Sequence, residues 1–207
     1  MLRIGLTGGI ASGKSSVAKM FTELGAVLVD TDQVAREVVT PGEPGLAAVK
    51  AEFGPDILTR EGSLDRGKLR SIVFADAPSR RRLEGILHPL IRQRTLQLLD
   101  AAQGAYAIVA VPLLVETGFG SLVDRVLVVD CRPETQLQRL MQRDGLSEPE
   151  ALAAIDAQVD RASRLAAADD VIDNDGPLNA TRQQVGILHQ RYLAIADDCR
   201  DRSGRAE

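Results

Sequence analysis

The residues from Gly8 to Ser15 have the types and the spacing of a phosphate-binding loop. Gly8 is followed by four residues and then by Gly13, Lys14 and Ser15, which fits the pattern GxxxxGK[ST]. Glycines let the backbone turn tightly, so that successive N–H groups point into one concavity that holds an anion. In this pattern the lysine reaches the β- and γ-phosphates of ATP, and the hydroxyl of Ser15 binds Mg²⁺. The stretch therefore predicts a site for ATP with Mg²⁺.

The sequence on either side of this motif supports the same interpretation. An apolar stretch from Leu2 to Leu6 precedes it, an amphipathic stretch from Val17 to Leu24 follows it, and Gly25 is placed to end that helix. The alternative is a glycine-rich turn that joins a strand to a helix and binds nothing. The nucleotide contacts that we expect in this loop are Gly8, Gly9, Ala11, Ser12, Gly13, Lys14, Ser15 and Ser16.

Two carboxylates follow the next apolar stretch, at a place where parallel sheets bind ligands. Residues 26–30 (AVLVD) are typical of a buried strand, and Asp30 and Asp32 stand at its carboxyl end. Asp32 could accept the proton of an acceptor hydroxyl, or mainly orient that hydroxyl. The alternative is that Asp32 caps a helix expected over residues 33–39, and the two roles are compatible. Asp30 could orient Asp32 or a metal-bound water.

A pair of arginines suggests a lid. Arg139 and Arg143 are four residues apart and share one face of the helix expected after Pro133. With a second helix, expected over residues 149–166, they could fold over the nucleotide and meet its γ-phosphate. The alternative is a surface helix with solvated arginines.

A long basic segment separates the second expected strand from the third. It covers residues 31–104, whereas a single crossover between parallel strands needs only roughly a dozen residues. From Arg60 to Arg94 there are nine basic and four acidic residues, a local balance of +5, which suits an anionic substrate. Solvation explains any single arginine equally well, and His88 is as consistent with packing as with a substrate contact. The helices expected here cover residues 46–53, 64–74, 78–87 and 90–101.

Strands and helices alternate along the chain. Further strands are expected over residues 105–111, 126–130 and 170–173, and a closing helix over 177–196 precedes a fraying polar tail. Five strands interleaved with helices predict a parallel α/β sheet covered on both faces, here a P-loop NTPase fold like that of nucleoside-monophosphate kinases. The expected parts of this single domain are a nucleotide-binding core (1–30, 105–138 and 166–207), a helical substrate insert (31–104) and a lid (139–165).

Composition excludes several classes of protein. With a net charge of −4, the chain lacks the excess of basic residues that is typical of nucleic-acid-binding proteins. Aromatic residues make up only 3% of the chain, which argues against a protein that binds single strands by base stacking. Cys131 and Cys199 show neither metal-binding spacing nor a disulfide framework, and we expect Cys131 to be a small core residue. The longest apolar run is too short to span a bilayer, and no signal peptide is evident. We therefore expect a cytoplasmic protein that binds small molecules, with no nucleic acid, no membrane and no obligate protein partner.

Several stretches together resemble the dephospho-CoA kinase family. They run in the family's order and cover the chain from residue 2 to about residue 193. Ala11 and Ser16 stand where the family commonly has Gly and Thr, and Thr31 stands where Ala is common; none of these removes a proposed catalytic group. The stretches are GLTGGIASGKSS (5–16), VDTDQVAREVV (29–39), HPLIR (88–92), VPLLVETG (111–118), RVLVVD (125–130), QLQRLMQRDG (136–145) and ADDVIDNDG (168–176).

The resemblance implies an activity and roles for residues. It implies transfer of the γ-phosphate of ATP to the ribose 3′-hydroxyl of dephospho-CoA, the last step of coenzyme A synthesis, with the acceptor bound by the insert. By this resemblance Asp32 matches the general base. The phosphates are contacted by Lys14, Arg139 and Arg143, and Asn174 falls where adenine would lie. The acceptor contacts that it implies are Thr7, Asp32, Arg36, His88, Pro112, Leu113 and Glu116.

Two other functions remain open at this point. A nucleoside or nucleoside-monophosphate kinase has a similar insert and lid, and differs in its acceptor. A regulatory module that only binds a nucleotide is less consistent with Asp32 and the lid arginines, since binding alone does not need them.

Overall fold

The computed structural model describes residues 1–112, 114 and 118–203. These residues form two compact units, which we describe separately. The core unit contains residues 1–30 and the part of the chain from Ala102 onward, and the helical unit contains Thr31–Ala101. None of the helices in the described part of the chain is long and apolar enough to cross a membrane.

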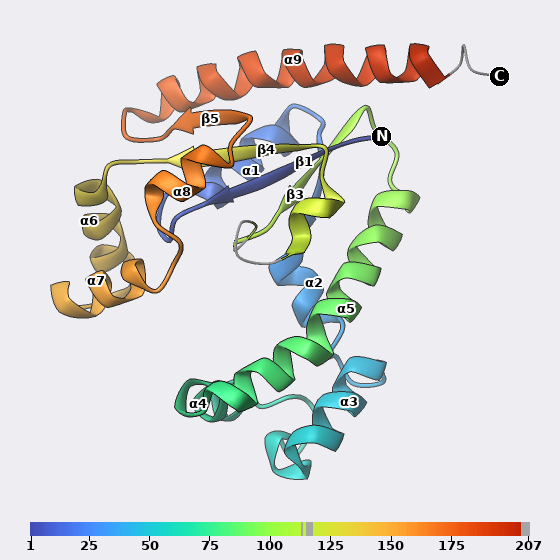
Figure 1. The fold of residues 1–207 in the computed structure, drawn as a ribbon, viewed down its shortest axis with the longest axis vertical. Coiled ribbons are helices and arrows are strands. Elements are labelled where there is room, and N and C mark those ends of the chain that lie inside the picture. The colour runs from blue at the N-terminus through green and yellow to red at the C-terminus, as the bar shows by residue number, and fades with distance from the viewer. Residues whose placement is uncertain (113, 115–117, 204–207) are drawn as a thin grey trace. The chain divides into compact units, whose positions relative to one another are not determined.

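The core unit is built on one parallel sheet of five strands, as expected, in the order β2-β3-β1-β4-β5. Figure 1 labels β3, β1, β4 and β5 of this sheet. Because every strand runs the same way, their carboxyl ends meet at one edge, where Gly8 pairs with Val129 and Asp130 pairs with Asp173. The central strands carry apolar residues on both faces because both faces are covered. The strands are β1 (Leu2–Gly8), β2 (Val27–Asp30), β3 (Tyr106–Ala110), β4 (Arg125–Asp130) and β5 (Asp170–Asp173).

Aromatic packing anchors two helices on this sheet. Helices α1 (Lys14–Glu23) and α9 (Leu178–Ser203) contact each other and β1. Between them Phe21 stacks on Tyr192, with ring centroids 6.0 Å apart, and meets the edge of Tyr106 at 6.4 Å. All three rings are almost completely buried. This cluster fixes the position of α1, the helix that follows the phosphate motif, and therefore the position of its N-terminus. The other helices of the unit are η2 (Gly118–Leu122), α6 (Pro133–Asp144), α7 (Glu148–Asp156) and α8 (Arg161–Ala166).

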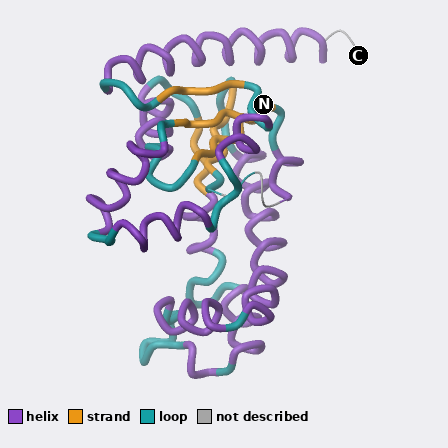
Figure 2. The backbone as a smooth tube through the Cα atoms, turned by 60° about the vertical axis from the view of Figure 1, so that its left-hand side comes forward, coloured by secondary structure: helices purple, strands orange, loops and turns teal. Residues whose placement is uncertain are grey.

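The helical unit consists of helices and loops (Figure 2). Its long helix α5 packs against α2, α3 and α4. Asp65 starts α4 as its N-cap, because its carboxylate accepts the N–H of Lys68 at 2.9 Å. The helices are α2 (Thr31–Glu37), α3 (Pro44–Phe53), η1 (Pro55–Ile57), α4 (Arg66–Ala75) and α5 (Ala77–Ala101).

Two of the expected helix boundaries in this unit are wrong. We expected Pro89 to separate two helices, but α5 runs through it unbroken. A proline inside a helix costs roughly 3 kcal/mol, and packing of Ile91, Thr95 and Leu99, which are all buried, offsets that cost. Helix α2 begins at Thr31 rather than after Asp32, so Asp32 lies in its first turn and is not its N-cap.

Two further corrections concern the core unit. The helix expected over residues 149–166 is divided into α7 and α8, because Asp160 takes an extended conformation and caps α8, accepting the N–H of Ser163 at 2.8 Å. The polar tail is helical as far as Ser203, since no glycine or proline interrupts the sequence between Gly186 and Gly204. Cys131 is buried as expected, and this burial raises the pKa of its thiol.

Candidate active site

The phosphate motif forms a tight loop between β1 and α1. The N–H of Ser12 donates to the carbonyl of Gly9 at 3.0 Å, and the N–H of Ser16 donates to that of Gly13 at 3.0 Å. Gly13 takes a left-handed conformation (φ 96°) immediately before α1. Ala11 is also left-handed (φ 61°), which is unusual for a residue with a side chain. The loop therefore leads directly into a helix N-terminus, where backbone N–H groups and the helix dipole favour phosphate.

Lys14 and Ser15 lie at the first two positions of α1. The side chain of Lys14 is half-buried, whereas Ser15 and Ser16 are exposed. Lys14 is therefore partly shielded from water beside the loop, and the Ser15 hydroxyl is accessible to a ligand.

Asn174 holds the loop from the end of β5. Its Nδ2 donates to the carbonyl of Ser12 at 2.7 Å, and its Oδ1 accepts the hydroxyl of Thr181 at 2.8 Å. The side chain is 92% buried. An adenine contact by Asn174 stays a prediction, and the contacts seen here make it a support for the loop.

This close approach explains why position 13 needs glycine. A Cβ on Gly13 would lie 2.1 Å from Asn174 Nδ2. Gly25, at the other end of α1, has nearly the same φ (92°) with open space around it.

We expect Gly25→Ala to lower the free energy of unfolding by roughly 1–2 kcal/mol through backbone strain alone. Gly13→Ala should cost about 1–3 kcal/mol more through the clash, as measured by urea denaturation. Equal losses in the two variants would show that Asn174 moves aside freely.

Of the two arginines expected in the lid, the structure brings Arg139 to Asn174, the residue that supports the loop. Arg139 on α6 donates from Nη2 to the carbonyl of Asn174 at 2.9 Å, and its Nη1 is buried without a hydrogen bond to any described residue. Arg143 is exposed and pairs with Asp144, its neighbour in the chain, at 2.7 Å. Arg139 thus contacts Asn174, which in turn contacts the phosphate loop, whereas Arg143 is paired with Asp144.

Sequence reasoning missed a group of side chains around the loop. Gln158, which follows α7, accepts the N–H of Ile10 at 2.7 Å. Arg164 on α8 and Gln136 on α6 lie over Gly9, where an added Cβ would be 3.0 Å from Arg164 Nη2 and 2.7 Å from Gln136 Nε2. The capping pattern from Asp160 to Ser163 could have indicated the helix break that brings this segment to the loop, but no local pattern indicates the contacts themselves.

The remaining expected contacts in the core unit follow β1 and β3. The buried hydroxyl of Thr7 donates to the carbonyl of Pro112 at 3.3 Å. This contact ties the start of the phosphate loop to the segment that follows β3. Leu113 and Glu116 lie outside the described residues.

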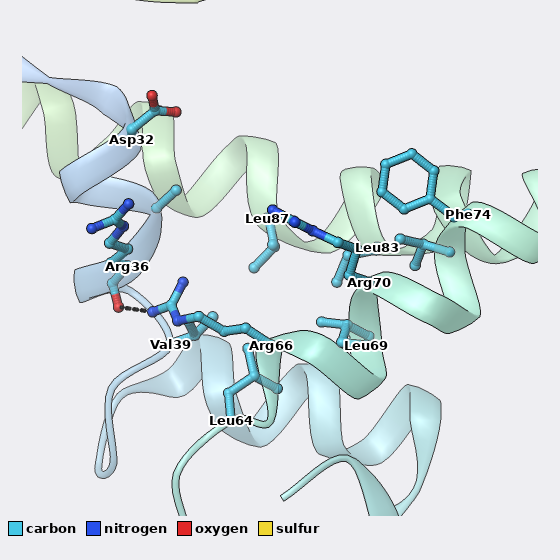
Figure 3. A pocket seen from close by; sticks show the side chains of 12 residues that line it. Asp32, Arg36, Val39, Leu64, Arg66, Leu69, Arg70, Phe74, Leu83 and Leu87 are labelled. Carbon is cyan, nitrogen blue, oxygen red and sulfur yellow. Dashed lines mark hydrogen bonds between the residues drawn. The ribbon is translucent and has the colours of Figure 1, made fainter. Parts of the chain in front are cut away.

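The helical unit contains a cavity of about 640 Å³. Asp32 and Arg36 line it from α2, Arg66 and Arg70 line it from α4, and Leu87 lines it from α5. Figure 3 shows Arg66 and Arg70 reaching from α4 toward α2, where Arg66 Nη2 donates to the carbonyl of Arg36 at 3.4 Å. Three cationic side chains and one carboxylate therefore line the cavity. The rest of its wall is Ala35, Val39, Leu64, Leu69, Val73, Phe74 and Leu83.

The other expected acceptor contact, His88, is exposed on α5 and does not line this cavity. Of the acceptor contacts expected in the helical unit, the structure thus brings together Asp32 and Arg36 but not His88.

The chain matches known proteins along nearly its whole length. Residues 2–180 match the family model CoaE, dephospho-CoA kinase. The dephospho-CoA kinase of Vibrio vulnificus is 52% identical over 196 residues, 94% of this chain and 97% of that protein. That of Thiobacillus denitrificans is 50% identical over 197 residues, 95% and 98% of the two chains. The solved structure of dephospho-CoA kinase from Campylobacter jejuni superposes with a TM-score of 0.71 at 30% identity, covering 93% of this chain and 97% of its own.

Proposed function

This chain belongs to the dephospho-CoA kinase family, and we propose on that premise that it transfers the γ-phosphate of ATP to the ribose 3′-hydroxyl of dephospho-CoA. The products are ADP and coenzyme A, and the reaction is the last step of coenzyme A synthesis. The family makes the chain a kinase with ATP as its donor.

The phosphate loop fits the donor. Phosphoryl transfer needs mainly positioning and charge neutralisation. The left-handed Gly13, the helix N-terminus after it and the half-buried Lys14 supply both at one point of the core unit. Mg²⁺ in such sites is held by one or two protein ligands and by substrate phosphates, where it neutralises charge. The exposed hydroxyl of Ser15 is the protein ligand that we propose for it.

The cavity of the helical unit carries the assignment of the acceptor. Dephospho-CoA has a diphosphate, an adenosine and a long, weakly polar pantetheine arm. The cavity matches this mixture, because Arg36, Arg66 and Arg70 stand on a wall that is otherwise mainly apolar. Charge-assisted hydrogen bonds from these guanidinium groups to the phosphate oxygens would hold the diphosphate in place. We therefore assign acceptor binding to the insert, residues 31–104, and closure over the donor to the lid, residues 139–165.

Asp32 is the residue that acts on the acceptor hydroxyl. It is exposed, it lines the cavity, and it lies one residue after the start of α2. In a loose transition state the attacking oxygen needs placement more than full deprotonation. Asp32 accordingly accepts a hydrogen bond from the 3′-hydroxyl and takes its proton as the new bond forms.

A panel of acceptors tests the function. ADP release is measured with dephospho-CoA, AMP, CMP and uridine, and ³¹P NMR of the product identifies the phosphorylated position. We expect turnover with dephospho-CoA to exceed the others greatly and the new phosphate to be on the 3′-oxygen. Preferred turnover of AMP, CMP or uridine would instead identify a nucleoside or nucleoside-monophosphate kinase.

Arg70 tests the cavity separately from the donor site. Arg70→Gln removes one cationic side chain from the cavity wall, and we expect the KM for dephospho-CoA to rise at least about tenfold, as for a lost charge-assisted hydrogen bond. The KM for ATP should stay within about twofold, because the phosphate loop belongs to the core unit. The matched control is Arg60→Gln, an exposed arginine of the same unit that does not line the cavity. An unchanged KM for dephospho-CoA in the Arg70 variant would remove this wall from the acceptor site.

The proposed partners are the two small-molecule substrates. The cytoplasmic location and the lack of an obligate protein partner, which the sequence indicated, stay predictions.

A further inference from the structure

The segment between α7 and α8 contacts the phosphate loop. Gln158 provides the direct link, since its Oε1 accepts the backbone N–H of Ile10 at 2.7 Å. Ile10 is the second residue after Gly8 and lies within the motif itself. A side chain almost 150 residues further along the chain therefore determines where one of the loop's own amide groups points.

Two more contacts hold this segment in place. Arg161, at the start of α8, forms a two-pronged ion pair with Asp130 at the end of β4, with contacts of 2.9 and 2.6 Å. Arg164, one turn later, is buried over Gly9 and donates to the carbonyl of Val159. In this structure Gln158 is thus presented to Ile10 by a segment that an ion pair ties to the end of β4.

The loop has a conformation that needs such support. Ala11, the residue after Ile10, is left-handed, a conformation that a residue with a side chain keeps only when its surroundings hold it there. The hydrogen bond from Ile10 to Gln158 holds the peptide group between Gly9 and Ile10, one residue before Ala11, and the hydrogen bond from Ser12 to Gly9 holds the peptide group that follows Ala11. Removal of the Gln158 acceptor frees the first of these peptide groups.

We propose that Gln158 is a positioning residue for the ATP donor. By accepting the N–H of Ile10 it keeps the phosphate loop in its phosphate-binding conformation before ATP arrives, so that binding does not have to order the loop. The neutral amide suits this position, because it supplies an acceptor without placing a negative charge beside the phosphates. The proposal rests on the proposed function only for its kinetic assay, since ATP binding can be measured without an acceptor.

The decisive variant is Gln158→Met, which keeps the length of the side chain and removes its acceptor. We expect the KM for ATP, and the Kd for the non-hydrolysable analogue AMP-PNP by calorimetry, to rise about tenfold, as for an unsatisfied backbone N–H. The KM for dephospho-CoA should change less than about twofold, because the acceptor cavity lies in the other unit. Gln190→Met, on the exposed side of α9, is the matched control and should leave all three constants unchanged.

Amide hydrogen exchange separates this role from a general loss of stability. In the protein without nucleotide, the N–H of Ile10 should exchange faster in Gln158→Met than in the wild type, with the strands of the sheet unaffected. Gln158→Glu restores an acceptor of the same length and should restore the protection of Ile10. If Gln158→Met does not fold, Gln158→Asn, whose side chain is one methylene shorter, should show the same changes.

Two results overturn the proposal: ATP constants within twofold of the wild type, or an equal rise in the KM of both substrates. A wild type that fails to phosphorylate dephospho-CoA, while Gln158→Met still weakens AMP-PNP binding, would contradict the proposed function and leave this inference standing.

Discussion

Replacing Lys14 by alanine is expected to lower turnover by at least ~10²-fold, the usual cost of losing one preorganised charge contact in the transition state. Lys14 stands at the first position of α1, beside the loop that we propose for the β- and γ-phosphates. Charge develops on the transferring phosphoryl group, so the loss should appear in kcat as well as in the KM for ATP. Steady-state ADP release at saturating dephospho-CoA measures both.

The matched control is Lys19→Ala, which removes an exposed lysine of the same helix. Both variants should have melting temperatures close to that of the wild type, because neither lysine belongs to the core cluster. Wild-type turnover in Lys14→Ala would contradict the assignment of the loop as the donor site.

Asp32→Asn is expected to lose most of the turnover and to retain ATP binding. General-base catalysis typically contributes about 10²–10⁴-fold, and the loss should fall within that range. Asparagine keeps one acceptor oxygen and loses the negative charge and the basicity. The KM for ATP should change little, because Asp32 lines the cavity of the helical unit that we propose for the acceptor.

A comparison of Asp32→Asn with Asp32→Ala separates the two possible roles of this carboxylate. If Asp32 acts mainly by orienting the 3′-hydroxyl, asparagine should preserve part of the activity that alanine abolishes. If it acts mainly as a base, the two variants should be equally slow. Asp56→Asn, an exposed aspartate of the same unit, is the control, and wild-type turnover in both Asp32 variants would remove Asp32 from the mechanism.

The loop between β1 and α1 was predictable because its sequence signal is local. The motif residues all lie within one short stretch, residues 8–15. The hydrophobic periodicity around this stretch indicates a strand before it and a helix after it. The five strands were predictable for a similar reason, since buried parallel strands are short apolar runs. The order β2-β3-β1-β4-β5 was not predicted, because pairing depends on contacts between segments far apart in the chain.

The errors in the helices arose where tertiary contacts outweigh local preference. Pro89 is a strong signal for a helix end, yet α5 continues through it because packing against three other helices offsets the lost hydrogen bond. Residues 149–166 have the composition of one helix. They break at residues 157–160, where Asp160 caps α8 and Gln158 is bound by the phosphate loop.

The sequence by itself therefore determined the phosphate-loop motif, the α/β class and the family. Residue types at short spacing indicate each of these features, because the local backbone geometry decides which neighbouring side chains can act together. Only the tertiary structure decided what holds the phosphate loop in shape: Asn174 beneath Ser12, and Gln158 on Ile10. These contacts join residues roughly 150 positions apart, and a hydrogen bond at that separation exists only once the sheet and its helices have brought the two groups within 3 Å of each other.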